Sequence, residues 1–68
     1  MNTRQYYYIS TIANYGNLSH AAQALHISPS ALSKFLTECE RIFGLTLFLR
    51  YNRRLYPTAA GHYVIDCA

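Results

Sequence analysis

Residues 21–36 read AAQALHISPSALSKFL, two apolar runs joined by the tetrapeptide His26-Ile27-Ser28-Pro29. Ser28 is a favourable helix N-cap, and Pro29 suits the first helical position because an N–H at that position would have no helical partner. A sharp turn before this start needs one residue at positive φ, and His26 is of a type enriched there. The stretch therefore predicts a helix-turn-helix whose second helix begins at a fixed place.

The apolar residues of this stretch fit two helices that cross closely. Where the helices cross, a side chain larger than a methyl group would clash, and Ala22 occupies that position. The residues expected to form the core around the turn are Ala21, Leu25, Ile27, Leu32 and Phe35. Leu36 and Cys39 continue the apolar stripe of the second helix at three- and four-residue steps, so Cys39 is expected to be a small buried residue.

The flanking segments predict a mainly all-α domain with a small β-hairpin. Apolar spacing indicates a helix over about 3–14 before the turn, and Ser19 is the expected N-cap of the next helix, which ends near Leu25. After Gly44, short apolar segments at 45–50 and 54–56 predict a two-stranded wing. Thr58 can then cap a last helix.

These elements predict a winged helix-turn-helix over residues 1–58, with the helix-turn-helix at about 18–37 and the wing at about 45–57. Residues 59–68 are expected to be the truncated start of a linker or dimerisation helix, because no glycine or proline ends it. Tyr63, Val64 and Cys67 suggest an apolar face on that helix.

Composition narrows the function classes. The 68 residues are 51% hydrophobic with a net charge of +3, which argues against disorder and favours a polyanionic partner. No apolar run is long enough to span a bilayer and no signal-peptide pattern is present, so a cytoplasmic location without membrane contact is expected. The cysteines and histidines lack metal-ligand spacing, and three acids offer no catalytic pair, so neither a metal, a cofactor nor an enzyme is expected.

The start of the second helix has the chemistry of a DNA contact. A helix N-terminus attracts phosphate, and the small polar residues Ser30 and Ser33 would let the backbone lie deep in a major groove. Lys34 could reach a guanine edge or a phosphate. At the wing tip, Arg53 and Arg54 could enter the minor groove or pair with phosphates. The alternative for these residues is an ordinary solvated face and a solubilising turn.

Arg50 is assigned a different role. It stands at a strand end where Glu40 of the long helix could meet it, so we expect Glu40 and Arg50 to form a structural ion pair rather than a DNA contact.

At this point the whole chain resembles the N-terminal DNA-binding domain of LysR-type transcriptional regulators. The matching stretches are Tyr15-Gly16-Asn17-Leu18-Ser19, Ala21-Ala22-Gln23-Ala24-Leu25-His26-Ile27-Ser28, Ala31-Leu32-Ser33-Lys34, Glu40, Gly44, Leu47-Phe48-Leu49-Arg50 and Pro57-Thr58-Ala59-Ala60-Gly61. The chain departs from the family pattern in several places. Pro29-Ser30 stands where Gln-Pro is frequent, and Lys34 stands where arginine is common. Thr3 and Cys39 each replace a usual leucine.

The resemblance implies a sequence-specific domain of a bacterial regulator that binds double-stranded DNA. The residues expected to contact DNA are Ser19, His20, Ser28, Pro29, Ser30, Ser33, Lys34, Thr37, Arg53 and Arg54. The intact regulator is expected to be a homodimer or tetramer that takes a small-molecule effector through a C-terminal domain absent from these residues. The 68-residue chain itself is expected to be monomeric or weakly dimeric. The alternative is a winged-helix module for protein–protein contact that has lost DNA binding.

Overall fold

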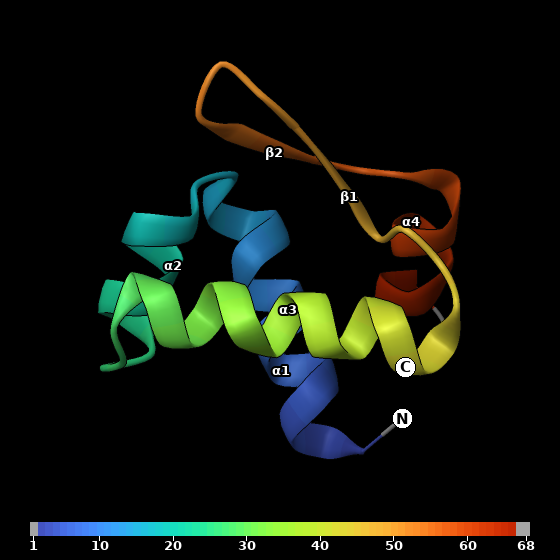
Figure 1. The fold of residues 1–68 in the computed structure, drawn as a ribbon, viewed down its shortest axis with the longest axis horizontal. Coiled ribbons are helices and arrows are strands. Elements are labelled where there is room, and N and C mark those ends of the chain that lie inside the picture. The colour runs from blue at the N-terminus through green and yellow to red at the C-terminus, as the bar shows by residue number, and fades with distance from the viewer. Residues whose placement is uncertain (1, 67–68) are drawn as a thin grey trace.

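The computed structural model describes residues 2–66 of the chain, and its helices surround a core that the β-hairpin covers along one side (Figure 1). The elements in chain order are α1 (Thr3–Tyr15), α2 (Leu18–Ala24), α3 (Pro29–Phe43), β1 (Phe48–Tyr51), β2 (Arg54–Pro57) and α4 (Ala59–Asp66). In Figure 1, α3 crosses in front of α1. The last helix, α4, packs against α1 and β2. This is the mainly α-helical winged helix-turn-helix that the sequence predicts.

Local capping explains where α1 begins and ends. The Asn2 side chain accepts a bond from the Gln5 N–H at 2.8 Å, and the Gln5 side chain accepts one from the Asn2 N–H at 3.0 Å. This reciprocal capping box satisfies two amides that have no partner in the helix. Gly16 ends the helix at φ +63°, a conformation that glycine adopts without steric penalty.

The N-cap of α2 is a correction to the sequence prediction. Asn17, not Ser19, is the N-cap: its backbone is extended and its side-chain oxygen accepts from the His20 N–H at 3.0 Å. Asparagine caps as well as serine does. Starting the helix at Leu18 also lets that side chain pack against the core. Ser19 is left exposed inside the first turn of the helix.

The turn between α2 and α3 has the predicted geometry. His26 lies at φ +59°, and the Ile27 N–H donates to the Ala22 carbonyl at 3.0 Å. The Ser28 hydroxyl then accepts from the Ala31 N–H at 3.1 Å, with Pro29 at the first helical position. Ala22 is fully buried, as expected for the residue at the helix crossing.

The wing is shorter than predicted at its first strand. β1 and β2 pair antiparallel, with Leu49 opposite Tyr56. Leu47 stays outside the ladder because its N–H donates to Glu40 and its carbonyl accepts from the Thr58 N–H at 2.9 Å. The two-residue turn, Asn52 and Arg53, has positive φ at both positions. That backbone matches the right-handed twist of a hairpin but usually requires asparagine or glycine.

The core follows the predicted stripes. The largest fully buried side chains are Ile9, Ile12, Leu32, Leu36 and Leu47. Leu25, Ile27 and Phe35 pack against this cluster but remain partly exposed. Burial raises the pKa of the Cys39 thiol, in agreement with its predicted position in the core.

The last helix begins as predicted. The Thr58 hydroxyl accepts from the Gly61 N–H at 3.0 Å, and the Thr58 carbonyl accepts from the His62 N–H at 2.9 Å. Cys67, which was expected on the apolar face of this helix, lies outside the described residues. Within residues 2–66, no helix is long and apolar enough to cross a bilayer.

Candidate nucleic-acid interface

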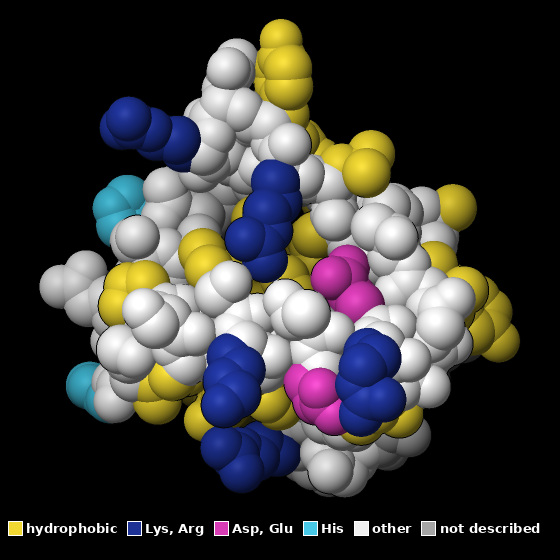
Figure 2. All heavy atoms as spheres, viewed as in Figure 1, with side chains coloured by type: hydrophobic (Ala, Val, Ile, Leu, Met, Phe, Trp, Pro, Cys, Tyr) yellow, Lys and Arg dark blue, Asp and Glu magenta, His cyan; other side chains and the backbone are white. Residues whose placement is uncertain are grey.

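The predicted contact residues of α3 lie along one exposed side of its N-terminal half. Ser30, Lys34 and Thr37 are exposed, and Ser33 is half-buried beside them. We call these four residues the α3 face. Their three- and four-residue spacing places them on one side of the helix. Figure 2 views the molecule from the side of α3 and shows Lys and Arg side chains over the helix and the wing.

The N-terminus of α3 is open to an anion. Ser28 and Pro29 are exposed, and the Ser28 hydroxyl already accepts from the Ala31 N–H. The Ser30 N–H has no intrahelical acceptor because it belongs to the first turn. Together with the positive end of the helix dipole, this amide gives the start of α3 a preference for negative charge.

The carboxylate of Glu38, farther along α3, is neutralised by neighbouring cations. Arg41 donates to Glu38 through Nε at 3.1 Å and through Nη2. The Arg41 hydrogen bond lowers the pKa of Glu38, and the charge of Lys34 lowers it further. The same pair raises the pKa of Arg41. This exposed acid therefore does not leave an unbalanced negative charge beside Lys34.

The predicted ion pair between Glu40 and Arg50 is wrong. Both residues lie within the described range 2–66, and they do not form an ion pair with each other. Glu40 Oε2 instead accepts from the backbone N–H groups of Leu47 at 2.7 Å and Phe48 at 3.3 Å. Residues 47–48 pass next to Glu40, so their two backbone amides contact the carboxylate. Arg50 lies farther along the chain and does not reach it.

The Arg50 guanidinium reaches the α3 face instead. Its Nη2 lies 3.4 Å from the Ser33 hydroxyl. Ser33 is seven residues before Glu40, about 10 Å nearer the N-terminus of the helix. Arg50 therefore belongs with the candidate contact residues, which the sequence interpretation missed. The signal available was its place beside Arg53 and Arg54 in a chain with only three acids.

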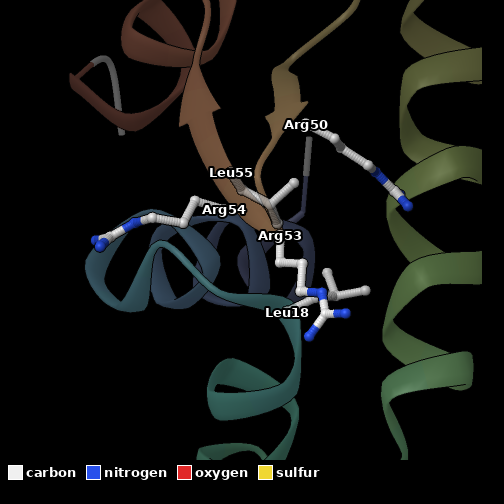
Figure 3. A pocket seen from close by; sticks show the side chains of 5 residues that line it. All are labelled: Leu18, Arg50, Arg53, Arg54 and Leu55. Atoms are coloured by element: carbon white, nitrogen blue, oxygen red, sulfur yellow. The ribbon is translucent and has the colours of Figure 1, made fainter.

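The side chains of the three wing arginines, Arg50, Arg53 and Arg54, point in different directions. A cleft of about 150 Å³ between the wing and α2 is lined by Leu18, Arg50, Arg53, Arg54 and Leu55, which we call the wing cleft. Figure 3 shows Arg53 extending toward Leu18 and Arg50 extending toward α3, whereas Arg54 points to the opposite side. Arg54 Nη2 would lie 3.6 Å from a Cβ placed on Gly16, so its end is beside the α1–α2 turn.

The two predicted residues of α2 are both exposed, but His20 is separate from the wing cleft. His20 lines a broad open depression of about 420 Å³ together with Tyr15, Gln23 and Ala24. The structure therefore brings Arg50 to the α3 face and Arg53 to the wing cleft, while His20 lines a different part of the surface. Among residues 2–66, there is no cluster of three or more His, Cys, Asp or Glu side chains that could bind a metal ion.

Comparison with known proteins places this geometry in a family. The sequence model of the family described as "Bacterial regulatory helix-turn-helix protein, lysR family" matches residues 3–62. The chain is 34% identical over 68 residues to the HTH-type transcriptional regulator TcbR of Pseudomonas sp. (strain P51), covering all of this chain and 23% of that protein. It is 36% identical over 61 residues to the transcriptional activator protein LysR of Escherichia coli (strain K12), covering 90% of this chain and 20% of that protein.

Solved structures of related DNA-binding domains share the fold of this chain. The chain has a TM-score of 0.90 and 33% identity with the structure titled "CbnR_DBD-DNA complex", covering 98% of this chain and 77% of that chain. A BenM_DBD complex with catB site 1 DNA also has a TM-score of 0.90, at 25% identity, covering 98% and 74% of the two chains. The chain spans about a fifth of the length of the two curated relatives named above. With the family model matching most of its length, the chain belongs to the lysR family of bacterial regulatory helix-turn-helix proteins.

Proposed function

We propose that this chain is the sequence-specific DNA-binding domain of a bacterial LysR-type transcriptional regulator, with the α3 face in the major groove. The observation that carries the proposal is the α3 face itself. It presents small hydroxyl side chains and one lysine next to an exposed helix N-terminus. Small side chains allow the helix backbone to come close to base edges, and serine, threonine and lysine can all contact bases or phosphates.

The remaining predicted residues are assigned to the edges of that interface. Ser19 and His20 lie exposed on α2, the helix that crosses the DNA backbone in a helix-turn-helix complex. The wing would lie along the backbone or the minor groove through its arginines. The CbnR and BenM structures are DNA complexes of related DNA-binding domains, and this supports the proposal.

The domain division and assembly follow from the same proposal. Residues 1–58 form the DNA-binding unit and residues 59–68 begin the linker helix. The intact regulator pairs as a homodimer or tetramer through that helix and binds an effector through a separate domain. It acts in the cytoplasm and has no enzymatic activity. We expect the 68-residue chain to be monomeric or weakly dimeric, because the eight residues of α4 are few for a helix that must also pair.

The experiment is selection of bound duplexes from a random DNA pool, followed by a salt titration of the recovered sequence. The recovered pool is expected to converge on one motif. The logarithm of affinity should fall linearly with the logarithm of salt concentration because bound phosphates release counterions. An unenriched pool, together with no salt-sensitive binding to any duplex, would instead favour a module for protein–protein contact.

A further inference from the structure

Ser33 on the α3 face carries a hydroxyl that does not bond to its own helix. A serine or threonine inside an α-helix often donates to the carbonyl four residues earlier, as Thr11 does to the Tyr7 carbonyl at 2.8 Å in α1. Among residues 2–66, the only hydrogen-bond partner of the Ser33 side chain is Arg50, whose Nη2 lies 3.4 Å from Ser33 Oγ. The Ser33 hydroxyl is therefore oriented by the wing and not by the backbone of α3.

The chemistry of the two groups fixes the direction of this hydrogen bond. A guanidinium has five N–H donors and no acceptor, so Ser33 Oγ accepts and Arg50 donates. The hydroxyl proton of Ser33 then points away from Arg50 and is free for another acceptor. A serine hydroxyl without such a neighbour rotates to donate or to accept. Arg50 therefore makes Ser33 a hydrogen-bond donor at the surface of α3.

The start of the wing holds Arg50 in this position. Glu40 accepts from the amides of Leu47 and Phe48, which fixes the beginning of β1 against α3. Side chains two residues apart in a strand lie on the same side, so Arg50 shares the side of Phe48, which is only 4% exposed. Figure 3 shows Arg50 extending toward α3. Among residues 2–66, no carboxylate forms an ion pair with Arg50, so none draws the guanidinium away from Ser33.

We propose that Arg50 is a positioning residue for base recognition. By orienting the Ser33 hydroxyl as a donor, it makes Ser33 select a keto base, guanine or thymine, over an amino base, adenine or cytosine, at one position of the operator. The proposal rests on the proposed function, which puts the α3 face in the major groove. In that groove guanine O6 and thymine O4 accept, whereas adenine N6 and cytosine N4 donate. A hydroxyl donor facing an amino group leaves two donors without acceptors, which lowers affinity.

The test measures affinities for the duplex recovered by selection and for all its single-base-pair variants. The parent chain should prefer a keto base about 3- to 10-fold at one position, the value for one net hydrogen bond, and Ser33→Ala should abolish this preference. Arg50→Met has no donor and should abolish the preference at the same position. In the Ser33→Ala background, Arg50→Met should not change base preference further.

Two variants serve as controls. Arg50→Lys should retain the keto preference, because an ammonium group also has donors and no acceptor. Arg41→Met removes the same charge from α3 outside the α3 face and should leave the preference unchanged.

The outcomes separate this proposal from the proposed function. If Arg50→Met lowers affinity for all four bases alike, or keeps a preference that Ser33→Ala removes, Arg50 does not orient Ser33 and the proposal is wrong. The parent chain also decides the result by itself, even if thermal melts show that Arg50→Met is unfolded. A preference for an amino base at the Ser33-dependent position, or the absence of any such position, would overturn the proposal. A parent chain that binds no duplex would instead overturn the proposed function.

Discussion

Replacing Glu40 by alanine removes the acceptor for two amides at the start of the wing. Glu40 Oε2 accepts from the Leu47 N–H at 2.7 Å and from the Phe48 N–H at 3.3 Å. Leu47 is 0% exposed and Phe48 is 4% exposed, so water has little access to the amides after the substitution. The Leu47 amide loses a short charge-assisted bond, while the Phe48 amide loses a weak one.

The magnitude follows from these burial values. A buried donor left without a partner costs about 1–3 kcal/mol, and one strong plus one weak bond gives about 2–3 kcal/mol for Glu40→Ala. The free energy of unfolding of a 68-residue domain is only about 3–10 kcal/mol. At about 4–8 °C per kcal/mol, the Tm should fall by roughly 10–20 °C.

Urea denaturation followed by circular dichroism measures the effect. Glu40→Gln should be intermediate, because its amide oxygen can still accept a bond but carries no charge. Arg50→Ala and Glu38→Ala are the controls, and both should be nearly neutral since these side chains are exposed. If Arg50→Ala costs as much as Glu40→Ala, the two residues act as an ion pair in solution and the account of Glu40 as an amide acceptor is refuted.

Three further substitutions test the packing and the interface. Gly61→Ala should destabilise the fold by about 1–2 kcal/mol in thermal melts, because its Cβ would lie 2.2 Å from the Leu47 carbonyl oxygen and the clash exceeds the helix-propensity gain; equal or higher stability would show that α4 can shift freely. Ala22→Val should cost about 1–3 kcal/mol because the site is fully buried at the helix crossing, and a neutral melt would contradict that crossing. Lys34→Ala should lower affinity for the selected duplex roughly tenfold, near the lower end of the 1–3 kcal/mol range for a base contact, with an unchanged Tm; a fall in Tm without loss of affinity would remove Lys34 from the interface.

The helices and the turn could be predicted from the sequence because local chemistry specifies them. Pro29 and Ser28 mark the start of α3, and His26 at positive φ marks the turn. Capping was less certain, since Asn17 and Ser19 are both good N-caps and the choice depends on Leu18 packing into the core. That choice is a tertiary effect, which no local pattern contains.

The interface could be predicted in part. The spacing of Ser30, Ser33 and Lys34 along one helix places them on one side without further information. The role of Arg50 could not be derived, because it depends on how the chain crosses α3. The backbone amides of Leu47 and Phe48 donate to the Glu40 carboxylate, and the Arg50 side chain extends toward Ser33 instead. Side chains from distant segments meet in three dimensions, and sequence proximity does not report their distances.

Mapping the ¹⁵N-labelled chain with the duplex recovered by selection tests the central claim most directly, because amide signals report contact even when binding is weak. The account predicts that the largest shifts occur at residues 28–37 and at the wing tip around Arg53, with little change along residues 59–66. Shifts confined to 59–66, with the α3 face unchanged at saturating duplex, would contradict the assignment of α3 to the major groove.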